Sequence, residues 1–110
     1  MIGPAVKRGS SELAILSVLA DEPLHGYELS RRIEQQTDGV LKFTLASLYP
    51  VLYRLERRGL IKGIWQEPTS GRRRRHYRLT AAGRRELQPL RAEWARLFQA
   101  LERLSGVADA

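Results

Sequence analysis

Cysteine is absent from the 110 residues, and histidine occurs only twice, as His25 and His76. Without cysteine the chain has no disulfide scaffold, no thiolate metal ligand and no cysteine nucleophile. The two histidines fall in different expected elements and no paired carboxylates accompany them, so we expect no metal site and no cofactor. No serine is matched to a base and an orienting group, so we expect no catalytic residue and no enzyme.

Long apolar runs are also absent. No stretch is long enough to span a bilayer, and the first residues, MIGPAVKRGS, lack the apolar core of a signal peptide. We therefore expect no membrane partner and a cytoplasmic location, which the lack of cysteine suits. With 43% hydrophobic residues, a chain of 110 residues forms one small domain, and a second copy sharing the core would help to stabilise it.

Acidic residues are scarce in the middle of the chain. Residues 50–78 hold nine basic and two acidic residues, a net charge of +7, whereas 1–49 sum to −1 and 79–110 to +1. The whole positive excess therefore lies in one central segment, as expected for a protein that binds a polyanion. Charge alone does not dismiss a nuclear-import or membrane-surface patch.

Hydrophobic periodicity and turn residues predict a mainly α fold with a small β-hairpin. Three helices, a two-stranded ribbon and a last helix, in that order, form a winged helix-turn-helix with an appended C-terminal dimerisation helix. In that architecture the third helix enters the DNA major groove and the hairpin wing reaches phosphates or the minor groove. We expect residues 1–80 to form the DNA-binding domain and 81–110 the dimerisation helix, within one compact unit. The expected elements are helices over 10–20 (capped by Ser10 or Ser11), 27–37 and 45–58 (capped by Thr44), strands over 60–67 and 72–80, and a helix from 81 to about 104 (capped by Thr80). In the second strand, Tyr77 and Leu79 share one face, and His76 and Arg78 share the other.

The third predicted helix contains the unusual stretch SLYPVLYRLERRGLI, residues 47–61. Pro50 removes a backbone donor and crowds the preceding turn, so it predicts a bend or a loosened first turn that presents the start of the helix. A tolerated distortion on a solvated surface is the alternative. Leu45, Leu48, Leu52 and Leu55 form one apolar stripe. The DNA-binding candidates of this region are Lys42, Thr44, Ser47 and Tyr49, and, for phosphates, Arg54, Arg57 and Arg58. The alternatives are that Tyr49 packs in the core beside Leu48 and Leu52, and that the arginines lie on a solvated helix face with Glu56 as a partial counterion.

The wing has the sharpest concentration of charge. Four arginines, 72–75, follow Gly71 at the expected hairpin turn, and no acidic residue interrupts them. Guanidinium groups suit both bidentate phosphate contact and a narrow minor groove. We assign Arg72, Arg73 and Arg74 to DNA and leave Arg75 open, because strand alternation turns about half of the side chains back.

Two further helices have candidate roles. In the second predicted helix, Tyr27, Arg31 and Arg32 are candidates for DNA backbone contact, although Glu28 and Glu34 lie within a turn and offer pairing partners for the arginines. The last helix repeats apolar residues at steps of three and four, which predicts a dimer seam, and Pro89 is expected to kink or split it near Arg85. The predicted dimer interface comprises Leu13, Leu16, Leu87, Leu90, Trp94, Leu97, Leu101 and Leu104.

Three blocks of the sequence resemble the PadR family of bacterial transcriptional regulators, in its short branch with a single C-terminal helix. They are HGYELSRRI (25–33), SLYPVLYRLERRGLI (47–61) and GRRRRHYRLTAAGRREL (71–87), and the similarity extends over about 10–104. The resemblance implies a homodimer that represses transcription from operator DNA and is released by a small molecule or a partner. It also implies that Trp94, with Phe98 nearby, stacks on a flat aromatic effector; simple packing is the competing interpretation.

The residues alone leave two other functions open. A nonspecific architectural DNA-binding protein would use the same positive charge without discriminating between bases. A winged-helix protein-interaction module would place the basic face against an acidic partner instead of double-stranded DNA.

Overall fold

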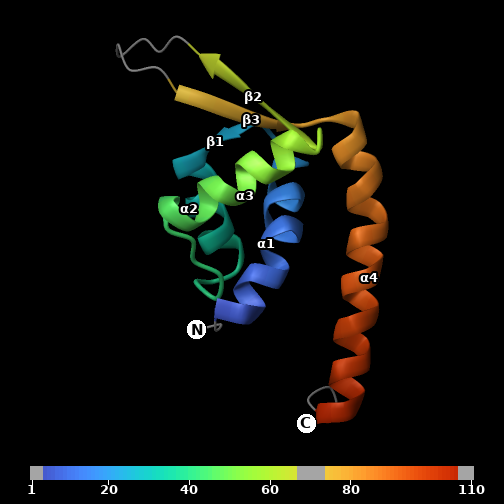
Figure 1. Ribbon diagram of the computed structural model, residues 1–110. Coiled ribbons are helices and arrows are strands. Elements are labelled where there is room, and N and C mark those ends of the chain that lie inside the picture. Colours follow the sequence, from blue (N-terminus) through green and yellow to red (C-terminus); the bar gives the residue numbers. More distant parts are fainter. Residues whose placement is uncertain (1–3, 67–73, 107–110) are drawn as a thin grey trace.

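The computed structural model describes residues 4–66 and 74–106. Three helices pack together, the sheet covers one end of them, and a long last helix stands alongside (Figure 1). The predicted winged helix-turn-helix with an appended C-terminal helix is confirmed. In chain order the elements are α1 (Pro4–Leu19), β1 (Leu24–His25), α2 (Gly26–Gln36), α3 (Leu45–Arg57), β2 (Ile61–Gln66), β3 (Arg74–Leu79) and α4 (Ala81–Ser105).

The first helix begins earlier than its sequence predicts. It starts at Pro4, so Ser10 and Ser11 lie inside α1 and do not cap it. Proline is well tolerated in the first helical turn, because the N–H that it lacks has no partner there in any case. Ser11 is buried beneath the neighbouring elements. Tertiary burial therefore outweighs the preference of serine for a helix end.

The break after α1 contains a short strand that the sequence did not predict. Leu24 and His25 form β1 and pair with Tyr77 and His76 of β3 in antiparallel register. Strand order is β1-β3-β2, so β3 is central and β2 forms an edge. Two residues give too little alternation to be read from sequence, yet they attach the start of α2 to the wing.

The wing itself matches the predicted alternation. β2 and β3 pair antiparallel from Ile61 opposite Leu79 to Gln66 opposite Arg74. Tyr77 and Leu79 are both buried on the face that meets the helices, as predicted, whereas Arg78 is exposed on the other face. The tip of the hairpin, 67–73, lies outside the described residues, and with it lie Arg72 and Arg73.

The third helix begins as predicted and differs in one detail. The side-chain oxygen of Thr44 caps it by accepting a hydrogen bond from the Ser47 N–H at 3.1 Å. The helix runs through Pro50 without interruption and is followed by Gly59 in a left-handed conformation. The predicted apolar stripe is buried at Leu48, Leu52 and Leu55, but Leu45 is 41% exposed because the first turn of α3 projects beyond the core.

One contiguous hydrophobic core joins α1, α2, α3, the sheet and the start of α4. Tyr77 is its largest fully buried side chain, and Leu60 and Ile61 continue the core where α3 leads into β2. Gly83 lets α4 approach this point, because a Cβ there would collide with the Leu60 carbonyl oxygen. The core residues are Ile15, Leu16, Val18, Leu19, Leu24, Leu29, Ile33, Leu48, Val51, Leu52, Leu55, Leu60, Ile61, Tyr77, Leu79 and Leu87.

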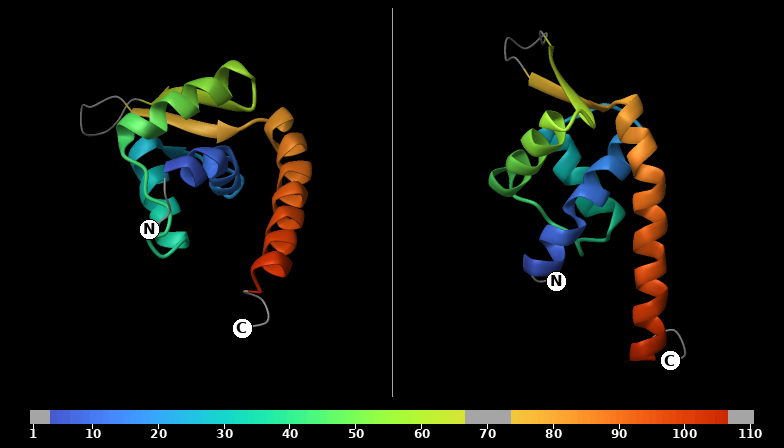
Figure 2. Two further views of the ribbon diagram at one scale, coloured as in Figure 1. Left: turned by 60° about the horizontal axis from the view of Figure 1, so that its bottom comes forward. Right: turned by 45° about the vertical axis from the view of Figure 1, so that its right-hand side comes forward.

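The last helix is capped by Thr80, as predicted, and runs unbroken through Pro89. Of the two outcomes expected of Pro89, a kink or a split, the split does not occur, because the helix continues on both sides of the proline. Its first turns pack against the body, and its C-terminal half extends beyond α1 in every view (Figures 1 and 2). The molecule is accordingly elongated, measuring 53 × 28 × 21 Å.

Two residues assigned to the dimer seam belong to the core of the single chain. Leu16 is fully buried and Leu87 is 3% exposed, so neither side chain has surface left for a second copy. The physical reason is that both lie where α1 and α4 pack against each other and the sheet. Leu13 and Leu90 are half-buried beside this core.

Candidate nucleic-acid interface

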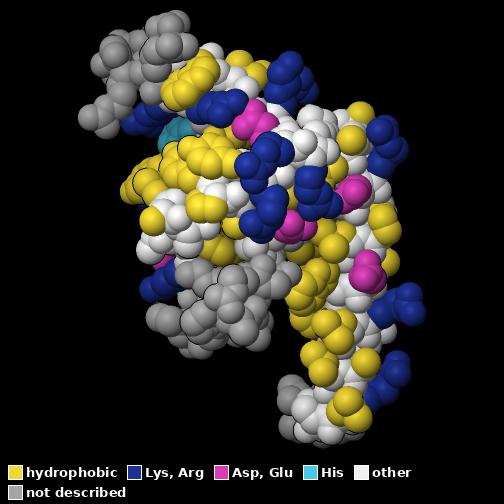
Figure 3. All heavy atoms as spheres, viewed as in Figure 1, with side chains coloured by type: hydrophobic (Ala, Val, Ile, Leu, Met, Phe, Trp, Pro, Cys, Tyr) yellow, Lys and Arg dark blue, Asp and Glu magenta, His cyan; other side chains and the backbone are white. Residues whose placement is uncertain are grey.

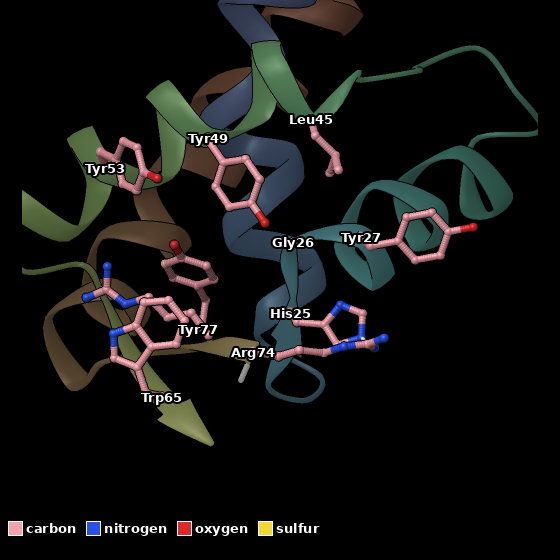
Figure 4. Close-up of a pocket in the computed structure, with 10 residues that line it drawn as sticks. His25, Gly26, Tyr27, Leu45, Tyr49, Tyr53, Trp65, Arg74 and Tyr77 are labelled. Atoms are coloured by element: carbon pink, nitrogen blue, oxygen red, sulfur yellow. Dashed lines mark hydrogen bonds between the residues drawn. The ribbon is translucent and has the colours of Figure 1, made fainter. Parts of the chain in front are cut away.

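A hollow of about 520 Å³ opens between the start of α2, the N-terminal half of α3 and the wing. Figure 4 shows side chains from all three elements converging on it. Its walls are mostly aromatic, and two guanidinium groups stand at its wing side. The lining residues are His25, Gly26, Tyr27, Leu45, Tyr49, Tyr53, Trp65, Arg74, Arg75 and Tyr77.

The α3 wall of the hollow is a second stripe on that helix. Leu45, Tyr49 and Tyr53 follow one another at steps of four, so they share one face. The rings of Tyr49 and Tyr53 stack with centroids 5.9 Å apart. Tyr49 also lies over Gly26, where a Cβ would come within 2.6 Å of its hydroxyl oxygen. The repeat of these residues at every fourth position is visible in the sequence, but only the neighbouring leucine stripe was predicted as a common face of this helix.

The exposed start of α3 presents polar side chains. Thr44 and Ser47 are exposed, and their hydroxyls hydrogen-bond to each other at 3.1 Å across the first turn. Lys42 precedes the helix and lies 3.8 Å from the Glu34 carboxylate, an ion pair between exposed groups. Such pairs are weak and exchange readily for another anion. The DNA-binding candidates Lys42, Thr44, Ser47 and Tyr49 therefore lie together at one end of α3.

The arginines at the other end of α3 are engaged within the molecule. Arg58 pairs with the carboxylates of Glu12 on α1 and Glu86 on α4, each at 3.1 Å, and Arg54 lies 3.6 Å from Glu12. The prediction that Glu56 serves these arginines is wrong, because its carboxylate turns to the wing. Among the described residues, Arg57 forms no ion pair. In Figure 3 these cations lie over the C-terminal part of α3 with acidic side chains among them, whereas apolar atoms cover its N-terminal part.

At the base of the wing, Arg74 and Arg75 point to different partners. Arg74 is exposed and reaches His25 of β1, its Nη1 lying 2.9 Å from the ring Nε2. Arg75 turns inward and bonds to Glu56 at 2.5 Å. The alternation left open in the sequence is thus decided for these two residues: Arg74 belongs to the outer rim and Arg75 to the interior of the wing.

His25 holds the start of α2 and fixes its own tautomer by doing so. Its Nδ1 accepts a hydrogen bond from the Glu28 N–H at 3.3 Å, and Glu28 returns one to the His25 N–H, which completes a capping box. The proton of the neutral ring therefore sits on Nε2, which lies 3.1 Å from the Glu28 carboxylate. Arg74 Nη1 lies 2.9 Å from the same Nε2, and this contact ties the base of the wing to the start of α2.

The pKa of His25 reflects the same surroundings. Burial lowers the pKa below its ordinary value of 6.5 against the opposing charge of Glu28, and Arg74 and His76 lower it further. The neutral ring that capping needs is thus the favoured form.

The DNA-binding candidates of α2 differ in the groups that they contact within the molecule. Tyr27 is exposed at the rim of the hollow, and the Arg31 guanidinium lies 5.8 Å from its ring centroid. Arg32 pairs at 2.6 Å with Glu22. The pairing that the sequence offered as an alternative, of Arg31 and Arg32 with Glu28 and Glu34, does not form among the described residues, because Glu28 caps α2 and Glu34 faces Lys42.

The C-terminal half of α4 exposes a continuous apolar stripe. Leu97, Leu101 and Leu104 are 46%, 50% and 86% exposed. Trp94 and Phe98 lie beside this stripe with ring centroids 5.6 Å apart. In water such a surface is unfavourable, so it marks an interaction site of the helix.

Neither a metal cluster nor a membrane segment emerges from the described part of the chain. Within residues 4–66 and 74–106, three or more histidine, aspartate or glutamate side chains nowhere gather in a way that holds a metal ion. Over the same residues, no helix is both long and apolar enough to cross a membrane.

Residues 15–89 match the Transcriptional regulator PadR-like family. A transcriptional regulator of Mycobacterium tuberculosis is 37% identical over 81 residues, 74% of this chain and 72% of that protein. The structure resembles a transcriptional regulator from Clostridium thermocellum with a TM-score of 0.83 and 32% identity, covering 94% of this chain and 97% of the other.

Bacillus subtilis PadR, solved in complex with operator DNA, shares the fold, with a TM-score of 0.66 and 24% identity over 72% of this chain and 45% of that one. The family match spans α2, α3, the wing and the start of α4, and it includes every residue that lines the aromatic hollow. Together with the winged-helix geometry, it shows that the chain belongs to the PadR-like family of transcriptional regulators and is a DNA-binding regulator, not an enzyme.

Proposed function

We propose that the protein is a homodimeric repressor that binds a pseudo-palindromic operator. Residues 1–80 form its DNA-binding part and 81–110 its dimerisation helix. Two copies present equivalent α3 helices about one DNA turn apart, roughly 34–36 Å, to successive major grooves. The start of α3 enters the groove, and the wing arginines lie along the flanking backbone.

The exposed stripe of α4 carries the proposal of a dimer. Leu97, Leu101 and Leu104 lie on an extended helix, with Leu90 and Trp94 half-buried nearer the body. A matching helix from a second copy covers these side chains at spacings of three and four, as in a coiled coil. Leu13 of α1 lies half-buried at the edge of the same region and completes the proposed interface.

The grouping of polar and basic residues supports the proposed DNA contacts. Lys42, Thr44, Ser47 and Tyr49 lie at the start of α3, and Tyr27 and Arg31 of α2 stand beside them. Arg74 is exposed on the wing, and within the described residues its guanidinium contacts the His25 ring and pairs with no carboxylate. Arg72 and Arg73 belong to the same proposed contact by their place in the hairpin. Bacillus subtilis PadR has been solved with operator DNA, and it shares this fold.

Selection of bound DNA from a random pool, with the purified protein, tests specificity and symmetry together. We expect two half-sites in inverted orientation, their centres about 10 base pairs apart or a multiple of that. If the dimer contacts about eight phosphates, log affinity falls with log salt at a slope of about −7. Recovery of no common sequence, with a similar slope, favours the nonspecific architectural protein instead.

Oligomeric state is measured independently by sedimentation. Replacing Leu97 and Leu101 with aspartate buries two unpaired charges at the proposed seam, so we expect a monomer at micromolar concentration with at least tenfold weaker operator binding. The pair Arg91→Ala and Arg96→Ala changes exposed positions of the same helix and leaves the dimer intact. A charged-seam variant that stays dimeric refutes the assignment.

The seam also offers a site for an effector. Trp94 and Phe98 place two aromatic rings together at the proposed dimer interface. We propose that a flat aromatic molecule stacks there and releases the dimer from DNA. Quenching of Trp94 emission in a Trp65→Phe background measures this binding, and Phe98→Leu in the same background should weaken it.

The remaining alternative is a winged-helix module that binds an acidic protein. It predicts that alanine at Arg72, Arg73 and Arg74 leaves affinity for DNA unchanged. The repressor predicts a loss for every sequence, because phosphate contacts are independent of the bases.

A further inference from the structure

We infer that Glu56 is a positioning residue that fixes the wing against α3 for DNA binding. The inference rests on the proposed function, in which α3 and the wing contact one duplex. The contacts involved are those of Glu56, Gly63 and Arg75, here called the Glu56 bridge. They join the last turn of α3 to both strands of the wing.

The Glu56 carboxylate contacts each wing strand through a separate donor. Its Oε2 accepts a hydrogen bond from the Gly63 N–H of β2 at 3.2 Å and another from Arg75 Nη2 of β3 at 2.5 Å. β2 is an edge strand, so the Gly63 amide has no strand on that side to bond with. One carboxylate therefore completes the hydrogen bonding of the edge and anchors the central strand.

Arg75 is held in place from two further sides. Its guanidinium carbon lies 5.9 Å from the Trp65 ring centroid and 5.6 Å from that of Tyr77. Cation–π contact with both rings fixes the plane of the guanidinium. Figure 4 shows the Trp65 and Tyr77 rings facing this side of the hollow, opposite Tyr49 and Tyr53.

The glycine at position 63 leaves the space that the bridge needs. A Cβ there would collide with the Arg75 guanidinium. Gly63 has neither a positive φ nor a turn to explain it, since it lies within β2 opposite Tyr77. Glycine weakens a strand interior, so its presence indicates that a close approach is required.

The bridge is partly shielded from water. The side chains of Arg75 and Glu56 are 29% and 25% exposed, less than those of Arg58 and Glu86. Arg75 Nε is buried and has no hydrogen-bond partner within the described part of the chain. Loss of the carboxylate would leave the Arg75 guanidinium and the Gly63 amide without this acceptor. Because unsatisfied polar groups are costly in a partly buried place, the wing is then expected to move.

The relation of the wing to α3 decides whether both reach one duplex. The start of α3 and the wing are separated by the hollow, so a small rotation of β2 and β3 displaces the hairpin tip relative to the major groove. DNA binding requires α3 and the wing to be in the bound arrangement at the same time. A loosened wing lowers the fraction of molecules in that arrangement. The bridge therefore acts on DNA affinity without touching DNA.

Glu56→Gln is a test in which a positioning role and no role for Glu56 predict opposite changes in DNA affinity. Glutamine has the same shape but no charge, so its one carbonyl oxygen accepts from Gly63 and Arg75 more weakly and the ion pair with Arg75 is lost. If Glu56 is a bystander, removing a negative charge near a polyanion strengthens DNA binding. If it positions the wing, we expect about tenfold weaker binding to the selected operator and a smaller loss on random DNA.

Glu12→Gln is the matched control. It makes the same change of charge and also removes a carboxylate that pairs with arginines, Arg54 and Arg58, but it has no contact with the wing. By the same reasoning, we expect Glu12→Gln to bind the operator as tightly as the unchanged protein or somewhat more tightly. Thermal midpoints of all variants show that each remains folded at the temperature of the binding assay.

A second measurement follows the wing in the absence of DNA. In a Trp94→Phe background, Trp65 is the remaining tryptophan, and it lies beside Arg75. We expect acrylamide to quench its emission more strongly after Glu56→Gln and equally after Glu12→Gln. Combining Glu56→Gln with Arg75→Gln adds little further loss of operator affinity, because the bridge is already broken.

The outcomes separate this inference from the proposed function. Unchanged or tighter operator binding by Glu56→Gln overturns the positioning role and leaves the repressor in place. Unchanged protein that binds operator and random DNA equally overturns the specific repressor, and the positioning role with it. Weaker binding by Glu56→Gln, with Glu12→Gln unaffected, supports both.

Discussion

The arginines of α3 and those of the wing are alike in sequence and differ in their surroundings. Arg54 and Arg58 lie beside carboxylates from α1 and α4. Arg74 contacts the His25 imidazole and, within the described residues, no carboxylate. One central segment with a net charge of +7 thus contains both structural cations and cations available to an external anion.

This difference shows that the net charge of a sequence segment does not by itself define a binding surface. Glu12 and Glu86 are distant in sequence from Arg58, yet the fold brings all three together. Sequence proximity assigned Glu56 to the α3 arginines, whereas the backbone direction at the end of α3 turns it to the wing. Arginines of one element pair with carboxylates of other elements. Only the folded structure therefore shows which arginines have a carboxylate beside them.

The most direct test of this difference is an alanine substitution of one wing arginine and of one α3 arginine. Arg74→Ala should weaken operator binding about tenfold and make the salt slope less steep by about 0.9 per subunit, because one phosphate contact is lost. Arg58→Ala removes the same charge and should change affinity less than threefold. Fluorescence anisotropy at several salt concentrations measures both. Equal losses would contradict the division of the arginines.

Much of the fold was accessible from the sequence because its signals are local. Thr44 and Thr80 cap their helices as predicted, and Tyr77 and Leu79 alternate with exposed neighbours. The early start of α1 and the strand at 24–25 were missed, since both depend on partners elsewhere in the chain. Pro89 did not split α4, because the capped and packed start of the helix holds the following turns in place.

The candidate site was predictable in part. The start of α3 and the wing were identified from charge and order, and they do flank one hollow. Trp65, Tyr53 and His25 were not assigned to it, because residues from three elements meet there only in the folded chain. The spacing of Leu45, Tyr49 and Tyr53 was the signal within reach. Leu16 and Leu87 were placed in the dimer seam by periodicity, which does not distinguish an intramolecular contact from one between copies.

The stability of the fold should depend more on Arg58 than on its neighbour Arg57, which forms no ion pair among the described residues. Arg58→Ala removes two ion pairs, and because these groups are largely exposed we expect a loss of up to about 1 kcal/mol in the free energy of unfolding. Arg57→Ala on the next position is the control and should cost less than half as much. Urea titrations at low and high salt measure the effect, which should shrink at 1 M salt. A salt-independent loss would point to packing of the arginine stem instead.

The smallest expected effect concerns the imidazole beside Arg74. The pKa of His25 in the folded protein lies below its ordinary value of 6.5, chiefly because of burial and despite Glu28, with Arg74 and His76 lowering it further. The unfolded chain therefore binds the proton first, so the stability that the neutral cap contributes is present above pH 6.5 and is lost as pH falls toward the folded pKa. We expect a loss of about 0.5 kcal/mol between pH 7 and pH 5.5, since protonation removes the acceptor that caps α2. His25→Asn keeps a capping oxygen and does not titrate, so its stability should vary less over this range. If the two proteins lose stability in parallel, the titrating group is another one, and the capping role of His25 does not depend on its charge.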